Sequence, residues 1–441
     1  MSLYASLFYS ADVQPLLSDE ATVQHMLRFE AALARSQADS GLIPAASADA
    51  IATCCSVALL DLEKLSRDIA LSGNAAIPLV KQLTEQVGQR DPDAARAVHL
   101  GATSQDVVDT ATVLTIKSVC EWLETRLSTL EDTLAALTRT HRQTVMVGRT
   151  LLQQAKPIPF GLKTAYWLDA VMRNRQRLAN VRKRVLVLQL AGAVGSRNAS
   201  ISAPVQQHMA DQLGLSPSVS WHTQRDNVAE LAAALGILTG SLGKIAKDVS
   251  LLMQTEIAEV LEGKAEGKGG SSTMPHKRNP VTCTAILANA NRVPSLVATM
   301  LAAMLQENER SAGLWHSEWE VLTEIMQLTA GTVARSLELL RHLEVDEQRM
   351  AQNLEQTNGL IYAETVSLAL APTLGKAAAH ELLEKATKQA IAQQKHLKDV
   401  LFGLNVDLPQ PDELFKPENA IGQSLDIIDT ILHQHHITKT Q

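Results

Sequence analysis

The sequence predicts an all-α protein organised around a long helical bundle. Apolar residues from Val113 to Leu137 recur in alternating three- and four-residue steps, with no glycine or proline between them, and a similar seam runs from Val228 to Leu252. Aromatic residues make up only 3% of the chain, and strand patterns are scarce. Each seam forms one apolar stripe on a long helix, and such a stripe is stable in water only when neighbouring helices cover it.

The first hundred residues read as short helices separated by loops. A helical stretch from Asp19 to Ser40 ends before Gly41, and a second helical run extends from Ser47 to Ile69. Gly41 and Pro44 mark the turn between them. The polar stretch 72–74 then interrupts the pattern, which suggests polar groups facing a cleft.

The middle of the chain carries the long helices. Further helices are predicted over 163–190, 228–262, 282–308 and 317–342. Short β-like pieces are predicted around Val145 to Thr150 and Val185 to Leu190. From about Asp346 the segments become shorter. The predicted domains are an N-terminal helical domain, a central bundle and a small C-terminal helical domain, over residues 1–106, 107–345 and 346–441.

Composition excludes several classes of function. The chain has 40 basic and 47 acidic side chains, a formal charge of −7 and no basic stripe, which argues against nucleic acid or an anionic membrane surface as a partner. There is no targeting segment and no uninterrupted apolar run long enough to span a bilayer, so we expect a soluble, cytoplasmic protein. The four cysteines lack the spacing of a metal site, and nothing calls for a metal or other cofactor.

The stretch Gly267 to Pro280 has the composition of a mobile loop that closes over a carboxylated substrate. Its glycines permit unusual backbone shapes, three hydroxyls begin at Ser271, and Lys277 and Asn279 supply donors for an anion. An ordinary solvated loop would also contain these residue types. Without ligand, we expect residues 263–273 to lack stable structure, because their first half has little to bury.

Two other segments could bind an anion. In His99–Asp106, Thr103 and Asp106 have the spacing of a capping box, and the helix that starts there presents free N–H groups to a carboxylate. In Gly148–Pro157 the helical periodicity breaks, and Arg149 is a substrate-binding residue or a surface ion-pair residue.

In order and spacing, these three segments resemble the signature regions of the fumarase/aspartase superfamily. The loop Gly270–Pro280, which reads Gly-Ser-Ser-Thr-Met-Pro-His-Lys-Arg-Asn-Pro, is the most specific match. The resemblance covers nearly the whole chain. It implies three helical domains and a homotetramer with a helical core, in which each active site is formed by three subunits.

The resemblance also assigns roles. Ser271 would move the proton at the carbon next to a substrate carboxylate. The serine alkoxide that this requires would be stabilised by loop N–H groups and Lys277. Lys277 and Asn279 would hold a substrate carboxylate, together with Thr103 and Ser104 at the helix mouth.

One position departs from the lyases of this superfamily. In fumarase and the adenylosuccinate lyases a histidine that acts as acid or base follows Thr150, and here the residue is Leu151. A carboxylate, with a pKa of about 4, can attack or leave without a proton donor. Lactonisation by a substrate carboxylate fits this change and is the reaction of the bacterial 3-carboxy-cis,cis-muconate cycloisomerases, which also lack that histidine. Three segments resemble this subgroup more than the lyases: 72–74, 221–226 and 309–319.

Five further residues remain open between binding and structure. Asn74 falls where relatives place a polar residue that contacts substrate. His99 orients a carboxylate or forms a hydrogen bond across a domain junction, and binding is favoured over catalysis. His316 lines the pocket or is a structural histidine. Arg310 and Arg225 contact a third substrate carboxylate or form ion pairs within the protein.

The resemblance therefore implies a cofactor-free cycloisomerase that acts on a small tricarboxylate, in the protocatechuate branch of aromatic catabolism. Two alternatives remain: a lyase of the adenylosuccinate type, and a non-catalytic structural relative. The sequence leaves open whether addition is syn or anti, which carboxylate attacks, and which subunit supplies each residue.

Overall fold

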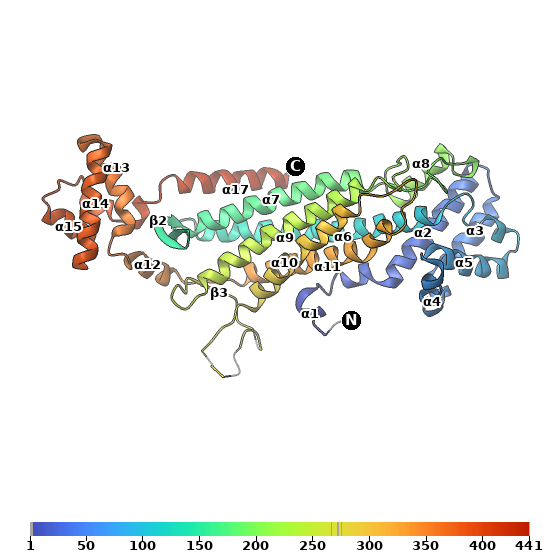
Figure 1. Cartoon of the computed structure of the whole chain (residues 1–441), viewed down its shortest axis with the longest axis horizontal. Helices are drawn as coiled ribbons and strands as arrows, with labels where there is room; N and C mark the ends of the chain where they lie inside the picture. The colour runs from blue at the N-terminus through green and yellow to red at the C-terminus, as the bar shows by residue number, and fades with distance from the viewer. Residues whose placement is uncertain (1–2, 266, 271–272, 275, 441) are drawn as a thin grey trace. The chain divides into compact units, whose positions relative to one another are not determined.

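The long helices of this computed structural model follow the predicted seams. The structure describes residues 3–265, 267–270, 273–274 and 276–440. Helix α6 (Ser104–Thr140) carries the first seam and α9 (Asp226–Leu252) the second (Figure 1). All seam side chains of α9 are buried, and those of α6 are buried except the half-buried Leu137. The all-α prediction is confirmed, because the described residues form only two small two-stranded sheets.

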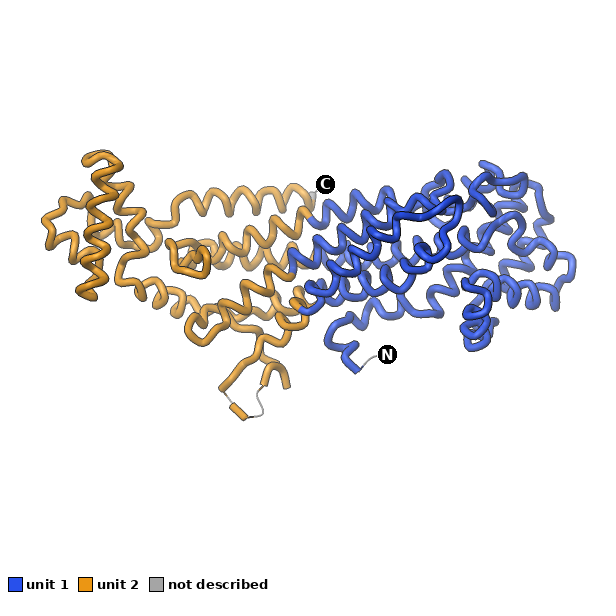
Figure 2. Tube along the Cα trace, in the orientation of Figure 1, with its two compact units in different colours: residues 1–127, 174–242, 288–334 blue, residues 128–173, 243–287, 335–441 orange. Residues whose placement is uncertain are grey.

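Contacts divide the chain into two units, which Figure 2 shows in different colours. Unit 1 contains residues 1–127, 174–242 and 288–334, and unit 2 contains residues 128–173, 243–287 and 335–441. The remaining long helices are α7 (Phe160–Val185), α10 (Val281–Ala302) and α11 (Leu314–Arg341). The division into three domains stays a prediction.

The shorter elements each belong to one unit. Those of unit 1 are α1 (Ala5–Phe8), α2 (Asp19–Asp39), α3 (Ala45–Cys54), α4 (Leu62–Ser72), α5 (Ala76–Arg90) and α8 (Ala203–Leu213). The helices of unit 2 are α12 (Glu347–Glu355), α13 (Ala363–Leu374), α14 (Lys376–Gln393), α15 (Leu397–Gly403), α16 (Pro411–Leu414) and α17 (Ser424–Thr440). Its strands are β1 (Val145–Thr150), β2 (Gln153–Pro159), β3 (Val260–Leu261) and β4 (Glu344–Val345). Strand β1 and helix α2 lie where the sequence predicted them.

The helical run predicted from Ser47 to Ile69 is wrong as one element, because α3 ends at Cys54 and α4 begins at Leu62. The Gln24 side chain bonds both the Cys55 carbonyl (3.2 Å) and the Val57 N–H (3.0 Å). The Gln82 side chain likewise bonds the N–H and the carbonyl of Asp61. These distant amides satisfy the backbone groups that a continuous helix would have paired.

The helix predicted over 228–262 is ten residues too long. Helix α9 ends at Leu252, Ala258 has a left-handed backbone conformation (φ 51°), and β3 pairs with β4. The predicted β-like piece from Val185 to Leu190 is also wrong, since α7 reaches Val185 and one isolated bridge joins Val187 to Ser216.

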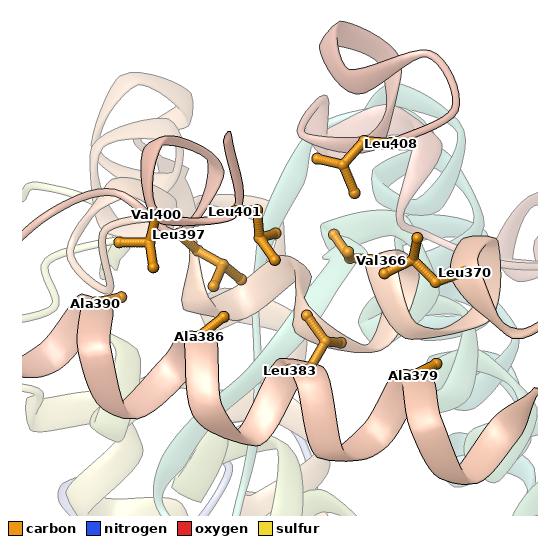
Figure 3. Packing of buried hydrophobic residues seen from close by; sticks show 10 residues of the cluster. All are labelled: Val366, Leu370, Ala379, Leu383, Ala386, Ala390, Leu397, Val400, Leu401 and Leu408. Atoms are coloured by element: carbon orange, nitrogen blue, oxygen red, sulfur yellow. The ribbon is translucent and has the colours of Figure 1, made fainter. Parts of the chain in front are cut away.

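Helices α13, α14 and α15 pack around an apolar cluster of their own, shown in Figure 3. The cluster consists of Val366, Leu370, Ala379, Leu383, Ala386, Ala390, Leu397, Val400, Leu401 and Leu408. Small alanines on one face of α14 let the neighbouring helices approach closely. Helix α9 is long and apolar enough to cross a membrane, but 61% of its most apolar stretch is buried within the fold, as in the core helix of a globular protein.

Candidate active site

Asp106, a buried residue in the first turn of α6, accepts hydrogen bonds that fix the N-terminus of this helix. The Thr103 N–H donates to Asp106 Oδ2 (3.0 Å), so this half of the predicted capping box is present. The same buried carboxylate accepts from the N–H groups of Ala191 (3.0 Å) and Gly192 (2.9 Å) and lies 2.9 Å from His222 Nε2. A carboxylate with this many donors is an internal anchor, and it fixes the segment after Leu190 against the helix mouth.

Arg310 lies beside this helix mouth. It comes from the loop between α10 and α11, and its Nη2 donates to Thr103 Oγ1 (2.9 Å) and to the Ala193 carbonyl (3.1 Å). Thr103 and Ser104 are half-buried. A guanidinium next to a helix N-terminus is a favourable environment for a carboxylate. The structure therefore brings Arg310, which is distant in the sequence, next to the adjacent predicted substrate-binding residues Thr103 and Ser104.

His99 is held by a buried glutamate. Its Nδ1 lies 2.7 Å from Oε1 of Glu30 in α2, and its backbone has a positive φ of 59°. Burial disfavours the charged imidazolium, but the Glu30 carboxylate, its hydrogen bond and the nearby Asp106 outweigh burial and raise the pKa of His99 above its ordinary value. The sequence reasoning missed Glu30, although an acidic residue among the buried positions of α2 is a visible signal.

His316 lies among aromatic rings. It is 5.2 Å from Trp315 and 4.6 Å from Trp319 between ring centroids. Its Nε2 donates to the Gly73 carbonyl (3.2 Å), while the side chain stays exposed. The structure thus places His316 next to the predicted polar stretch 72–74.

Asn74 caps helix α5. Its side-chain Oδ1 accepts from the N–H groups of Ala76 (3.1 Å) and Ile77 (3.3 Å). This contact assigns a structural role to Asn74, and the predicted binding role requires a separate test.

Two substitutions at this position separate the roles. Asn74→Ala should lower the stability by about 1 kcal/mol, because the cap is lost. Asn74→Asp keeps an acceptor for the same N–H groups but loses the amide donor. If Asn74 binds substrate, Asn74→Asp should keep the thermal midpoint and raise KM. An unchanged KM in Asn74→Asp would leave the residue with only its capping role.

Arg225 is an internal ion-pair residue, the structural alternative that the sequence left open. Its guanidinium contacts the buried carboxylates of Asp109 (2.8 and 3.1 Å) and Glu318 (2.5 to 3.1 Å) and lies over the Trp221 ring, 4.7 Å from the centroid. Burial disfavours the charge, but the two carboxylates raise the pKa of Arg225, so it stays charged. These contacts occupy the donors that a substrate carboxylate would need.

A cavity of about 630 Å³ lies in unit 1 and is lined by Asp109, Arg225, Glu318 and Trp319. Its size suits a small ligand. Its remaining charged residues are all acidic: Asp19, Glu320 and Glu324. This surplus of carboxylates would repel a polyanionic substrate, and the cavity is therefore no part of the candidate active site.

In unit 2, Arg149 forms a two-pronged ion pair with Glu259. Each Nη lies 2.8 Å from one carboxylate oxygen, and Glu259 is fully buried. The Asn353 amide also donates to Glu259 Oε1 (2.8 Å). The structure thus favours an ion pair at Arg149, as the sequence allowed, and its substrate-binding role stays a prediction.

Two residues of the predicted catalytic loop form ion pairs with glutamates outside it. Arg278 Nη1 donates to Glu344 (2.8 Å), and Lys268 Nζ donates to Glu338 (2.9 Å). Glu262, just before the loop, accepts from the N–H groups of Thr282 (3.1 Å) and Cys283 (2.8 Å) at the start of α10. The sequence contained no signal for this distant cap.

Of the three residues that the sequence assigned to loop chemistry, the structure describes two. Lys277 is exposed, and the half-buried Asn279 donates its N–H to the Gly269 carbonyl (2.9 Å). Ser271 lies outside the described residues, as do 266 and 272 within the stretch 263–273. The roles of Ser271, Lys277 and Asn279 stay predictions.

Leu151 lies at the tip of the β1–β2 hairpin. Leu151 and Leu152 form the turn with positive φ angles of 49° and 66°, and their side chains are 96% and 78% exposed. The turn therefore presents apolar side chains at its tip, and Leu151 offers no group that can act as an acid or a base.

The predicted site residues divide between the two units. Unit 1 holds Asn74, His99, Thr103, Ser104, Arg310 and His316, and unit 2 holds Arg149, Lys277 and Asn279. Within unit 1 the structure joins Thr103 to Arg310 and the 72–74 loop to His316.

Comparison with known proteins gives matches along the whole chain. Residues 11–295 match the family described as Lyase, and residues 359–431 match the family described as Adenylosuccinate lyase C-terminus. The 3-carboxy-cis,cis-muconate cycloisomerase of Acinetobacter baylyi is 47% identical and the match covers 98% of each chain. The enzyme of that name from Bradyrhizobium diazoefficiens is 47% identical over 98% of this chain and 97% of its own. The crystal structure of the 3-carboxy-cis,cis-muconate lactonizing enzyme from Pseudomonas putida matches with a TM-score of 0.94 at 45% identity, over 99% of each chain.

Proposed function

The chain belongs to the fumarase/aspartase superfamily, and we propose that it is a cofactor-independent cycloisomerase that closes 3-carboxy-cis,cis-muconate to a carboxymuconolactone. The observation that carries this proposal is the end-to-end similarity to enzymes named for that reaction. The pathway that supplies the substrate is protocatechuate catabolism.

The chemistry of Leu151 supports lactonisation over elimination. An amine or alkoxide leaving group is strongly basic and usually needs a proton donor, whereas a carboxylate nucleophile attacks as the free anion. In the reaction, a carboxylate oxygen of the substrate adds to the alkene carbon β to a second carboxylate. The electron pair moves onto that second carboxylate, and a proton then reaches the α-carbon. No step requires an acid at the Leu151 position.

The remaining roles follow the same scheme. Ser271 delivers the proton to the α-carbon, and Lys277 with Asn279 stabilises the aci-carboxylate. Thr103 and Ser104, at the positive end of α6, bind a substrate carboxylate. Arg310 supports that site, because its guanidinium already lies 2.9 Å from Thr103 Oγ1. Asn74, His99, Arg149 and His316 complete the set of proposed substrate-binding residues.

The proposed assembly is a cytoplasmic homotetramer whose active sites gather residues from different subunits. Apolar side chains that this chain leaves exposed support it. Leu301 in the last turn of α10, and Met304 and Leu305 just after the helix, are 50%, 36% and 81% exposed. Burying such a cluster against another subunit would be favourable.

The deciding experiment follows the ultraviolet absorbance of the conjugated diene of 3-carboxy-cis,cis-muconate. The purified protein should remove the diene without added metal or cofactor. Adenylosuccinate and argininosuccinate, assayed in parallel, should give no fumarate. The similarity of residues 359–431 to the adenylosuccinate lyase C-terminus makes that lyase the second candidate. Turnover of adenylosuccinate without diene loss would replace the proposal by this candidate, and inactivity on every substrate would favour the structural relative.

A further inference from the structure

Glu30 is a buried carboxylate whose Oε1 lies 2.7 Å from His99 Nδ1. Its side chain is 1% exposed, and Oε2 has no hydrogen-bond partner among the described residues. Neighbouring positions of α2, such as Leu27, Phe29 and Ala31, are buried and apolar. A buried carboxylate is costly unless it is paired. The contact with His99 therefore accounts for the presence of a charge at this point in the helix.

The geometry of the pair determines which ring atom of His99 is available. A carboxylate oxygen accepts, so the proton between Oε1 of Glu30 and Nδ1 of His99 belongs to Nδ1. Nε2, on the other side of the ring, makes no hydrogen bond with a residue that the structure describes. The side chain of His99 is 19% exposed, so the ring is accessible. Its backbone, with φ at 59°, is strained for a residue other than glycine.

The charges around His99 favour the imidazolium. The groups that act on it are Glu30 from α2 and Asp106 from α6, both acidic, and together they raise the pKa of His99 against the effect of burial. Cys55, after α3, also lies in the field of Glu30. Burial first, and then Glu30, raises the pKa of this thiol, so it stays neutral and adds no charge.

We propose that Glu30 is a positioning residue that holds His99 through Nδ1, so that Nε2–H of the imidazolium is presented to a substrate carboxylate. The inference deepens the proposed function and rests on it, because it assigns the donor atom of a predicted binding residue. Glu30 itself does not touch the substrate. Its effect on binding passes through the tautomer, the orientation and the charge of His99.

Two substitutions of His99 separate its two ring nitrogens. The amide nitrogen of asparagine takes the position of Nδ1, and that of glutamine takes the position of Nε2. His99→Asn keeps a donor for Glu30 and loses the donor to substrate. It should raise KM for the muconate by about ten- to a hundredfold, as expected for one charge-assisted hydrogen bond, and lower the thermal midpoint less than His99→Gln does. His99→Gln should show the smaller rise in KM. Equal effects of the two variants on KM and on the thermal midpoint would overturn the proposal.

Glu30→Gln tests the charge of the pair. The wild type should lose kcat/KM at high pH, as the imidazolium deprotonates, and Glu30→Gln should lose it at lower pH, because the acidic partner is gone. Glu318→Gln removes another buried carboxylate that faces Arg225 instead of a histidine. This control should lose stability and keep the pH profile of the wild type. An unshifted profile in Glu30→Gln would contradict the proposal.

A stability measurement keeps the inference separate from the proposed reaction. The pKa of His99 is raised in the folded state, so the pair stabilises the fold fully below a pH of about 6.5, the pKa of a histidine in the unfolded chain. This stabilisation is lost as the pH rises through the pKa of His99 in the folded protein. The difference in thermal midpoint between wild type and Glu30→Gln should therefore shrink as the pH rises. A constant difference would refute the pair even if the wild type turns over the muconate, whereas lack of turnover with a shrinking difference would refute only the proposed function.

Discussion

Replacing Arg225 by alanine should cost about 3–5 kcal/mol of folding free energy, the range for removing one partner of a buried ion pair. Arg225 is 4% exposed, and its guanidinium is shared by Asp109 (2% exposed) and Glu318 (3% exposed). Without it, two carboxylates remain buried beside each other with no cation between them. The Trp315 Nε1–H donor to Asp109 (3.0 Å) and the Gln306 amide donor to Glu318 (2.9 Å) are neutral and cannot replace the lost charge.

Denaturant unfolding of the purified protein would measure this loss. Arg184→Ala is the matched control, because Arg184 also forms an ion pair, with Glu230, but its side chain is 54% exposed. Solvent screens such a pair, and its removal should change stability little. Arg225→Lys should recover only part of the loss, since an ammonium cannot reproduce the forked contacts to both carboxylates. If Arg225→Ala were no more damaging than Arg184→Ala, the buried cluster would not be a source of stability.

Ser271→Ala should lower kcat for diene loss by about 10²- to 10⁴-fold, the usual contribution of a positioned proton donor. The proposed role of Ser271 is to protonate the α-carbon of the aci-carboxylate after the carboxylate has added. Binding of the substrate carboxylates depends on other groups, so KM should change little. The loss should therefore appear in kcat and kcat/KM to a similar extent.

The neighbouring hydroxyl provides the control. Ser272→Ala removes the same side-chain hydroxyl from the neighbouring position of the loop and should retain most of the activity. In deuterated water the wild-type product should carry one deuterium at the α-carbon. The configuration at that carbon in the residual product of Ser271→Ala should show whether another group delivers the deuteron to the same face. Full activity in Ser271→Ala would keep the reaction and transfer the protonation step to another residue, with His99 and His316 as the first to test.

The sequence predicted correctly the helices whose apolar periodicity and caps are formed by residues of the same segment. Helix α6 follows the Val113–Leu137 seam, and α2 has its own cap, where Ser18 Oγ accepts from the Ala21 N–H (3.2 Å). The failures lie where a distant side chain competes for the backbone. Gln24 and Gln82 interrupt the run predicted from Ser47 to Ile69, and neither glutamine is recognisable as a breaker from its own neighbourhood.

For the site, sequence motifs alone identified the family and the absence of a histidine at Leu151, and they predicted the loop that carries Ser271 and Lys277. The partners of the charged groups are visible only in the folded chain. The sequence left Arg149 and Arg225 open between anion binding and ion pairing, and the structure pairs each of them with a buried carboxylate. The role of Glu30 is visible only in the structure, where α2 places its carboxylate against His99. A charged side chain has few donors or acceptors, and the partners that use them come from elements far away in the chain, so periodicity and motif spacing do not encode them.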